Sequence, residues 1–118
     1  MSYVDGFIVP VPTANLAEYK KFSRKAGKIW REHGALGYFE CAGDDVKPGK
    51  QTSFPQSVKL RPDETVVFAW IVYKSRAHRD RVNALVMADP RIAGMSMDDA
   101  PFDAKRMIYG GFKVIVDV

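Results

Sequence analysis

The sequence predicts a single α+β domain over residues 1–118, of the ferredoxin-like type, with elements in the order β-α-β-β-α-β. Such a chain forms a four-stranded antiparallel sheet with both helices on one face. Two observations lead to this prediction. Amphipathic segments of helical length are interleaved with strand-like segments rich in β-branched and aromatic residues. In addition, Asp5-Gly6-Phe7 is similar to Gly110-Gly111-Phe112, which favours pairing of the first strand with the last.

The first half of the chain predicts a strand, a helix and a second strand. Residues 2–11 are rich in Val, Ile and Phe, and the prolines at their end stop the strand. Asn15 can cap the helix, with Glu18 as its capping-box partner, and Gly34 ends it. Residues 35–42 form the second predicted strand. The helix carries apolar residues on one side and a basic face on the other, made of Lys20, Lys21, Arg24, Lys25, Lys28 and Arg31.

The second half begins with residues 43–63, which are rich in turn-forming residues and lack periodicity. A loop of this length is functional or mobile. Residues 64–73 predict the third strand, and Ser75 can cap a second helix that runs to Ala88. A short turn follows, and residues 106–118 predict the last strand. The inner side of the second helix is expected to carry His78, Val82, Leu85 and Val86.

The third strand is apolar on both faces, because residues 66–73 carry only aliphatic and aromatic side chains. Leaving four of its large side chains in water would forfeit roughly 6–12 kcal/mol. This loss is comparable to the whole free energy of unfolding of a typical domain, about 5–15 kcal/mol. We therefore expect a homodimer in which two sheets face each other across a twofold axis. The alternative is a monomer whose 43–63 loop folds across the sheet. Alternation places Val66, Phe68, Trp70 and Val72 on the open side.

Composition limits the classes of protein that remain. The net charge is +4, but the 18 basic residues are scattered among 14 acidic ones, which is not typical of a nucleic-acid binder. A single cysteine, Cys41, excludes an internal disulfide and favours a reducing compartment such as the cytoplasm. No apolar stretch has membrane-spanning length and no basic-then-apolar leader begins the chain, so we expect no membrane association.

Several motifs together resemble the YbaA-like family of small bacterial proteins. They are Tyr3-Val4-Asp5-Gly6-Phe7, His33-Gly34-Ala35-Leu36, Asp44-Asp45-Val46, residues 66–71, Asp89-Pro90-Arg91 and the long run from Pro101 to Phe112. The resemblance implies the dimeric α+β barrel fold, a group that also holds cofactor-independent monooxygenases, heme-degrading enzymes and ligand-sensing modules. It implies dimerisation and carries over no catalytic residue, since the family is described as a domain of unknown function.

Two carboxylates lie inside otherwise apolar strands and are the candidate catalytic groups. Asp5 and Glu40 each need a partner if buried, and we expect that partner among Lys105, Arg106 and Tyr109 of the last strand. A carboxylate with a raised pKa beside a tyrosine can abstract a proton from an activated substrate. The alternative is a structural salt bridge at the end of the sheet.

The candidate ligand-binding residues are Tyr3, Tyr38, Trp70 and Arg106. Together with Tyr109, the aromatic members can line a pocket for a flat apolar molecule. Trp70 is the strongest single candidate. The alternative is that these side chains belong to the core or to an interface, where Tyr and Trp are enriched.

The remaining reactive side chains favour structural roles. His33 and His78 lack the spacing of a metal site and are expected to cap helix ends or pack at the core edge. Cys41 follows a carboxylate, which would raise its pKa, and is expected to be a small buried apolar residue. We expect no metal and no cofactor.

The sequence therefore favours a protein that binds a small apolar or aromatic molecule, with a cofactor-independent monooxygenase- or isomerase-like activity. The alternative is a non-catalytic dimer that binds a metabolite or a protein. Nucleic-acid binding through the basic helix face is a weaker third interpretation, and it predicts an affinity that falls steeply with salt.

Overall fold

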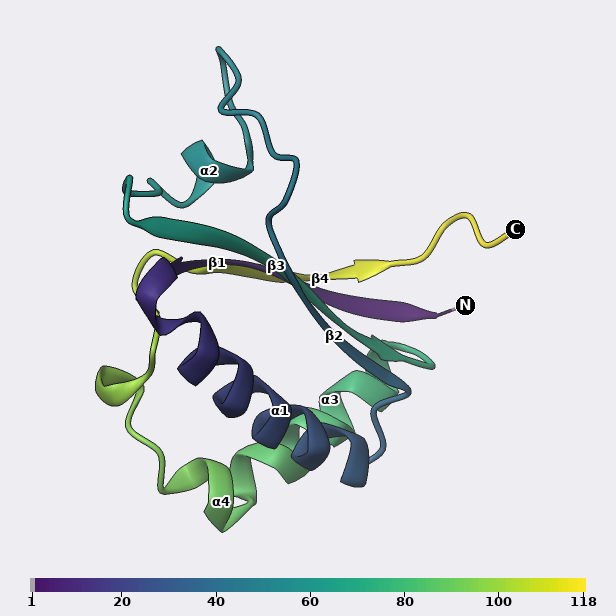
Figure 1. Ribbon diagram of the computed structural model, residues 1–118. Coiled ribbons are helices and arrows are strands. Elements are labelled where there is room, and N and C mark those ends of the chain that lie inside the picture. The colour runs from purple at the N-terminus through teal and green to yellow at the C-terminus, as the bar shows by residue number, and fades with distance from the viewer. Residues whose placement is uncertain (1) are drawn as a thin grey trace.

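The structure is a computed structural model that describes residues 2–118, and it confirms the α+β fold (Figure 1). The sheet has four strands in the order β2-β3-β1-β4, and all neighbours are antiparallel. Helices α1, α3 and α4 cover one face, and the segment with α2 lies on the other. The elements are β1 (Tyr3–Pro12), the 3-10 turn η1 (Thr13–Asn15), α1 (Leu16–Glu32), β2 (Gly37–Ala42), α2 (Phe54–Ser57), β3 (Glu64–Tyr73), α3 (Arg76–Ala88), α4 (Pro90–Ala93), the 3-10 turn η2 (Met97–Asp99) and β4 (Ile108–Lys113).

The predicted pairing of the first and last strands is confirmed. Gly6 lies opposite Gly110 of β4 and also opposite Trp70 of β3. Gly111 has a further reason to be glycine, because a Cβ there would collide with the hydroxyl group of Tyr3. The similar glycine-containing pieces of β1 and β4 therefore allow close packing at the centre and edge of the sheet.

The helix-facing side of the sheet forms the core, as the alternation predicts. In β3, Val67, Ala69, Ile71 and Tyr73 are all less than 5% exposed. Side chains of α1 and α3, including Ile29, Val82 and Val86, pack against this face in two adjoining clusters. Burial of these aliphatic groups holds the two long helices against the sheet.

The opposite side of the sheet is only partly covered. The 43–63 loop bends over one end, where Val58 is 1% exposed and Pro10 and Val66 are also buried. Phe54 meets Phe68 edge to face at 5.8 Å. The alternative of a loop folded across the sheet thus holds for one end only. We call the remainder the open face; its exposed large side chains are Phe39, Phe68, Ile108 and Phe112.

Several local predictions need correction. Asn15 makes no capping bond with its side chain, because the turn η1 leads directly into α1. Leu85 is 53% exposed and does not lie on the inner side of α3. The last strand covers Ile108–Lys113 instead of residues 106–118. Beyond it only Val114 continues the ladder, donating its backbone N–H to the carbonyl of Ser2.

The cap of α3 is as predicted. The Ser75 hydroxyl accepts the backbone N–H of His78, and the His78 ring in turn accepts the N–H of Lys74 through Nδ1. None of the helices that the structure describes is both long and apolar enough to cross a bilayer.

Candidate functional site

A groove of about 830 Å³ lies between α1 and the edge strand β2, on the helix-covered side of the sheet. Its volume is in the range of small-molecule sites, about 300–1,000 Å³. The lining combines an apolar and aromatic floor with a basic rim. It consists of Leu16, Tyr19, Lys20, Ser23, Arg24, Gly27, Lys28, Arg31, Glu32, Tyr38, Glu40, Cys41, Ala42 and Val67.

Glu40 is the acidic group on the floor of this groove. It points from β2 toward α1, and its carboxylate accepts hydrogen bonds from Tyr19 Oη at 2.7 Å and from Tyr38 Oη at 3.3 Å. Burial raises the pKa of Glu40 above its ordinary value, although the two tyrosine hydrogen bonds oppose that rise. The carboxyl group is therefore more easily protonated than a solvent-exposed one.

The two tyrosines keep their hydroxyl protons, and so remain hydrogen-bond donors, over the whole physiological pH range. Burial raises the pKa of both Tyr19 and Tyr38, and the neighbouring Glu40 raises each further. A carboxyl group with two fixed hydroxyl donors is preorganised, because neither donor needs to reorient when the charge on Glu40 changes.

Small residues on α1 let the tyrosine of β2 approach the helix. A Cβ on Gly27 would lie 2.6 Å from Cδ1 of Tyr38, so only glycine permits this packing. Trp30 also packs against this ring, with the ring centroids 6.1 Å apart. Tyr19 and Gly27 are not among the site residues that the sequence predicts. The signal in the chain was the helical spacing of Tyr19, Ser23 and Gly27, which places two small residues in line with a tyrosine.

Basic residues form a row along the groove. Lys20, Arg24 and Lys28 are spaced four residues apart and therefore share one stripe of α1. Among residues 2–118, none of the three forms an ion pair. Arg31, three residues after Lys28, also lines the groove, but it donates to the carbonyl of Leu36. We call Lys20, Arg24 and Lys28 the basic row.

Asp5, the other candidate carboxylate, lies outside the groove. It is 6% exposed, and Arg79 Nη1 approaches its Oδ1 at 3.3 Å. The same guanidinium donates to Tyr3 Oη at 3.0 Å, with its central carbon 5.0 Å from the centroid of the Tyr3 ring. Burial raises the pKa of Asp5, and the attraction of Arg79 opposes this rise. Strand β3 separates β1 from β2, so Asp5 and Glu40 do not meet.

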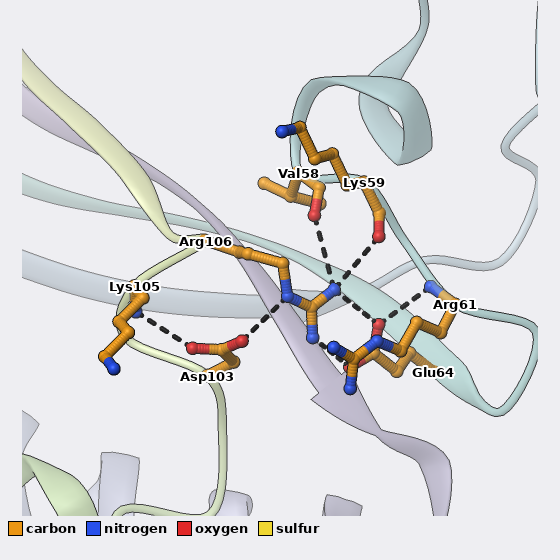
Figure 2. Close-up of polar contacts among 7 residues, drawn as sticks. All are labelled: Val58, Lys59, Arg61, Glu64, Asp103, Lys105 and Arg106. Atoms are coloured by element: carbon orange, nitrogen blue, oxygen red, sulfur yellow. Dashed lines mark hydrogen bonds and ion pairs between the residues drawn. The ribbon is translucent and has the colours of Figure 1, made fainter.

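The expected partners of these acids on the last strand are wrong. Arg106 instead pairs with Glu64 at 2.5 and 2.8 Å and with Asp103 at 2.8 Å, as Figure 2 shows. It also donates to the carbonyls of Val58 and Lys59. The hydrogen bonds from Arg106 lower the pKa of Glu64, whose side chain is 3% exposed. Arg106 thus ties the 43–63 loop, the start of β3 and the segment before β4 together.

The aromatic candidates for ligand binding lie on different faces of the sheet. Tyr38 lines the groove, whereas Trp70 lies on the open face, 4.9 Å from Phe39 and 5.5 Å from Phe68 between ring centroids. Trp70 lines a second, apolar hollow of about 290 Å³ beside Phe54. The predicted set of Tyr3, Tyr38, Trp70 and Arg106 therefore does not surround one cavity. Whether any member binds a ligand stays a prediction.

Tyr109 and Lys105 do not reach either carboxylate candidate. Tyr109 is 73% exposed and stacks on Phe7 with ring centroids 6.1 Å apart. Lys105 donates its backbone N–H to Asp103. The fold places neither Asp5 nor Glu40 beside Tyr109, so a catalytic role for Tyr109 stays a prediction.

The histidines and the cysteine occupy separate places. His33 Nε2 lies 2.8 Å from Oδ2 of Asp89, at the junction of α1 with α4, in the structural role that the sequence favoured. Cys41 is exposed on β2, so the expectation of a buried cysteine is wrong; its edge-strand position leaves it uncovered. Within the described chain, no three His, Cys, Asp or Glu side chains are grouped closely enough to hold a metal ion.

Comparison with known proteins finds relatives without an assigned activity. Residues 2–104 match the family described as a protein of unknown function, DUF1428. Uncharacterized protein YbaA of Escherichia coli strain K12 is 46% identical over 117 residues, which is 99% of both chains. The protein of the same name from Shigella flexneri matches equally well. A de novo designed protein, Foldit4, has a TM-score of 0.48 and 8% identity over 97% of this chain and 99% of that chain, a likeness that says nothing about activity.

Proposed function

The chain belongs to the DUF1428 family of proteins of unknown function, and we propose that it binds a small molecule with an apolar or aromatic body in the groove between α1 and β2. Glu40 is the group that exchanges a proton with the bound molecule, in an isomerase-like reaction. The resemblance to YbaA that the motifs indicate is confirmed by the 46% identity. The observation that carries the proposal is a half-buried carboxyl group held by two tyrosines on the floor of a groove.

Support for binding comes from the composition of the groove. Tyr38, Leu16 and Val67 offer an apolar floor, and the volume of about 830 Å³ accommodates a molecule of metabolite size. A few polar groups among apolar ones are the usual composition of a ligand site, because the apolar floor supplies affinity and the polar groups orient the ligand.

Support for proton transfer comes from Glu40. A raised pKa brings a carboxyl group closer to the neutral range, where a general acid or base works best. In the proposed step a C–H bond of the substrate breaks and its proton passes to the Glu40 carboxylate. The proton returns to the same or a neighbouring carbon of the substrate. A monooxygenase-like reaction would share the first of these steps.

The experiment is a search for deuterium incorporation that screens many candidate substrates at once. The protein is incubated with a bacterial metabolite extract in D₂O, and proton NMR follows the loss of C–H signals. We expect at least one signal to disappear with the wild type and to persist with Glu40→Gln. Glu18→Gln, an exposed acid of α1 outside the groove, is the matched control and should behave as the wild type. Persistence of every signal with the wild type would refute the catalytic part of the proposal.

We propose the homodimer as a second, non-catalytic candidate, in which the open face binds a second copy or another protein. Phe39, Phe68, Ile108 and Phe112 are between 42% and 63% exposed on this face. Sealing about half of each of four such side chains would contribute roughly 3–6 kcal/mol. Native mass spectrometry of freshly purified protein gives the number of subunits and any retained ligand together. A strictly monomeric mass would contradict this candidate.

A further inference from the structure

We propose that the ligand of the groove is an organic anion, whose apolar body lies on the floor while its carboxylate, sulfonate or phosphate group binds the basic row. This inference rests on the proposed function, because it names the class of molecule that the same groove accepts. It goes further in assigning Lys20, Arg24 and Lys28 as the residues that select for charge.

The rim of the groove carries an excess of positive charge. Basic side chains spaced four residues apart on a helix repel one another and destabilise it. An acidic residue at the same spacing can relieve this repulsion, and Glu32 stands four residues after Lys28. Its carboxylate pairs with Arg91, however, and none of the three basic residues forms an ion pair within the described chain. The row is therefore a fixed local excess of positive charge beside a concave surface, which concentrates anions there.

The two acids of the groove, Glu32 and Glu40, do not pair with the basic row. Glu32 is bound by Arg91 at 2.6 Å. The Glu40 carboxylate accepts hydrogen bonds from the hydroxyl groups of Tyr19 and Tyr38. An incoming anion therefore meets three cations without ion-pair partners at the rim, while both acids of the groove already have partners of their own.

The basic row follows the rim over some distance. Its ends, Lys20 and Lys28, lie eight positions apart in the chain, or about 12 Å along the helix axis. A molecule that spans the groove from Tyr38 to the rim can place one anionic group near two of the cations. Such a molecule is amphipathic, with one apolar end and one charged end.

The same helix supplies an internal comparison. Lys21 and Lys25 are also exposed and basic, but they do not line the groove. A general attraction of anions to the basic helix would involve them equally. A site for an organic anion in the groove depends on the basic row instead.

The test uses two fluorescent probes that share one ring system. N-phenyl-1-naphthylamine is neutral, and 8-anilinonaphthalene-1-sulfonate carries a sulfonate in addition. We expect the sulfonate probe to bind the wild type about 5- to 10-fold more tightly than the neutral probe. Backbone amide NMR shifts, with circular dichroism as a check on folding, show whether each probe contacts the α1–β2 groove.

The variants separate the groove from the rest of the helix. Arg24→Gln/Lys28→Gln should lower the affinity for the sulfonate probe to that for the neutral probe and leave the neutral probe unchanged. Lys21→Gln/Lys25→Gln should change neither affinity by more than about twofold. Equal affinity of the two probes for the wild type, or an equal effect of the two double variants, would overturn the inference while leaving neutral binding in the groove intact.

Three further outcomes bear on the inference. Probe-induced shifts confined to the open face would refute the proposed groove itself. Displacement of the sulfonate probe by a thymidine dodecamer at lower concentration than by a small aromatic carboxylate would overturn the small-anion class in favour of nucleic acid. Weaker binding of the sulfonate probe at high salt, with the neutral probe unaffected, supports the inference.

Discussion

Gly27→Ala tests the packing of Tyr38 against α1, because the substitution has two opposing effects on the free energy of unfolding. In an ordinary helix the change would stabilise the protein by about 1 kcal/mol, since glycine is a poor helix former. Here the new methyl group would lie 2.6, 2.9 and 3.1 Å from three ring carbons of Tyr38. Carbon atoms in contact lie at about 3.5–4.0 Å, so the ring must move by roughly 1 Å.

The cost of that movement decides the outcome. Overpacking a well-packed site costs about 1–3 kcal/mol. Moving the ring also stretches the hydrogen bond from Tyr38 Oη to Glu40, already 3.3 Å long, with a further loss of about 0.5–1.5 kcal/mol. After subtracting the gain in helix propensity, we expect Gly27→Ala to lower the free energy of unfolding by about 1–3 kcal/mol.

Urea denaturation of a double-mutant cycle gives the measurement. In the background of Tyr38→Ala the obstructing ring is absent, so Gly27→Ala should stabilise the protein by about 1 kcal/mol. The sign of the effect therefore reverses between the two backgrounds. The neutral naphthylamine probe should also bind Gly27→Ala more weakly than the wild type, because Tyr38 forms part of the groove floor.

A single result would refute this reasoning. If Gly27→Ala stabilised the wild-type background as much as the Tyr38→Ala background, the ring would not be packed against α1. The groove between α1 and β2 would then lack the wall that the proposal requires.

Three other changes have expected outcomes. Arg106→Met should lower the free energy of unfolding by about 2–3 kcal/mol, less than for a deeply buried pair because Arg106 keeps 14% exposure. Adding Glu64→Gln should restore part of that loss in urea denaturation, since Glu64 otherwise stays buried and unpaired. Glu40→Gln should flatten the pH dependence of stability above pH 4.5. The raised pKa means that wild-type stability falls as pH rises from that value through the folded-state pKa, where Glu40 ionises; an unchanged slope would contradict the burial of Glu40. Phe68→Asp should give a folded monomer by native mass spectrometry and circular dichroism if the open face forms the dimer, and a persistent dimer would exclude that face.

Patterns within the chain predict most of the fold and two residues that line the groove, Glu40 and Tyr38. Alternation along β3 correctly predicts which of its side chains face the helices and which face the open side. Glu40 is predicted as a site residue because it is a carboxylate in an otherwise apolar strand. The same pattern also predicts Asp5 as a site residue, but the fold places Asp5 against Arg79 and away from the groove. A carboxylate in a strand signals that a partner exists, but local sequence does not say which residue that partner is.

Patterns along the chain predict the order of elements, the face that each strand turns to the helices, and the pairing of β1 with β4. Period-two and helical spacings are local properties, so they can be read from neighbouring residues. Two contacts follow only from the packed fold: Tyr19 bonds to Glu40, 21 residues away, and Arg106 pairs with Glu64, 42 residues away. These contacts depend on the angle and distance between packed elements, which long-range burial sets and no local spacing encodes.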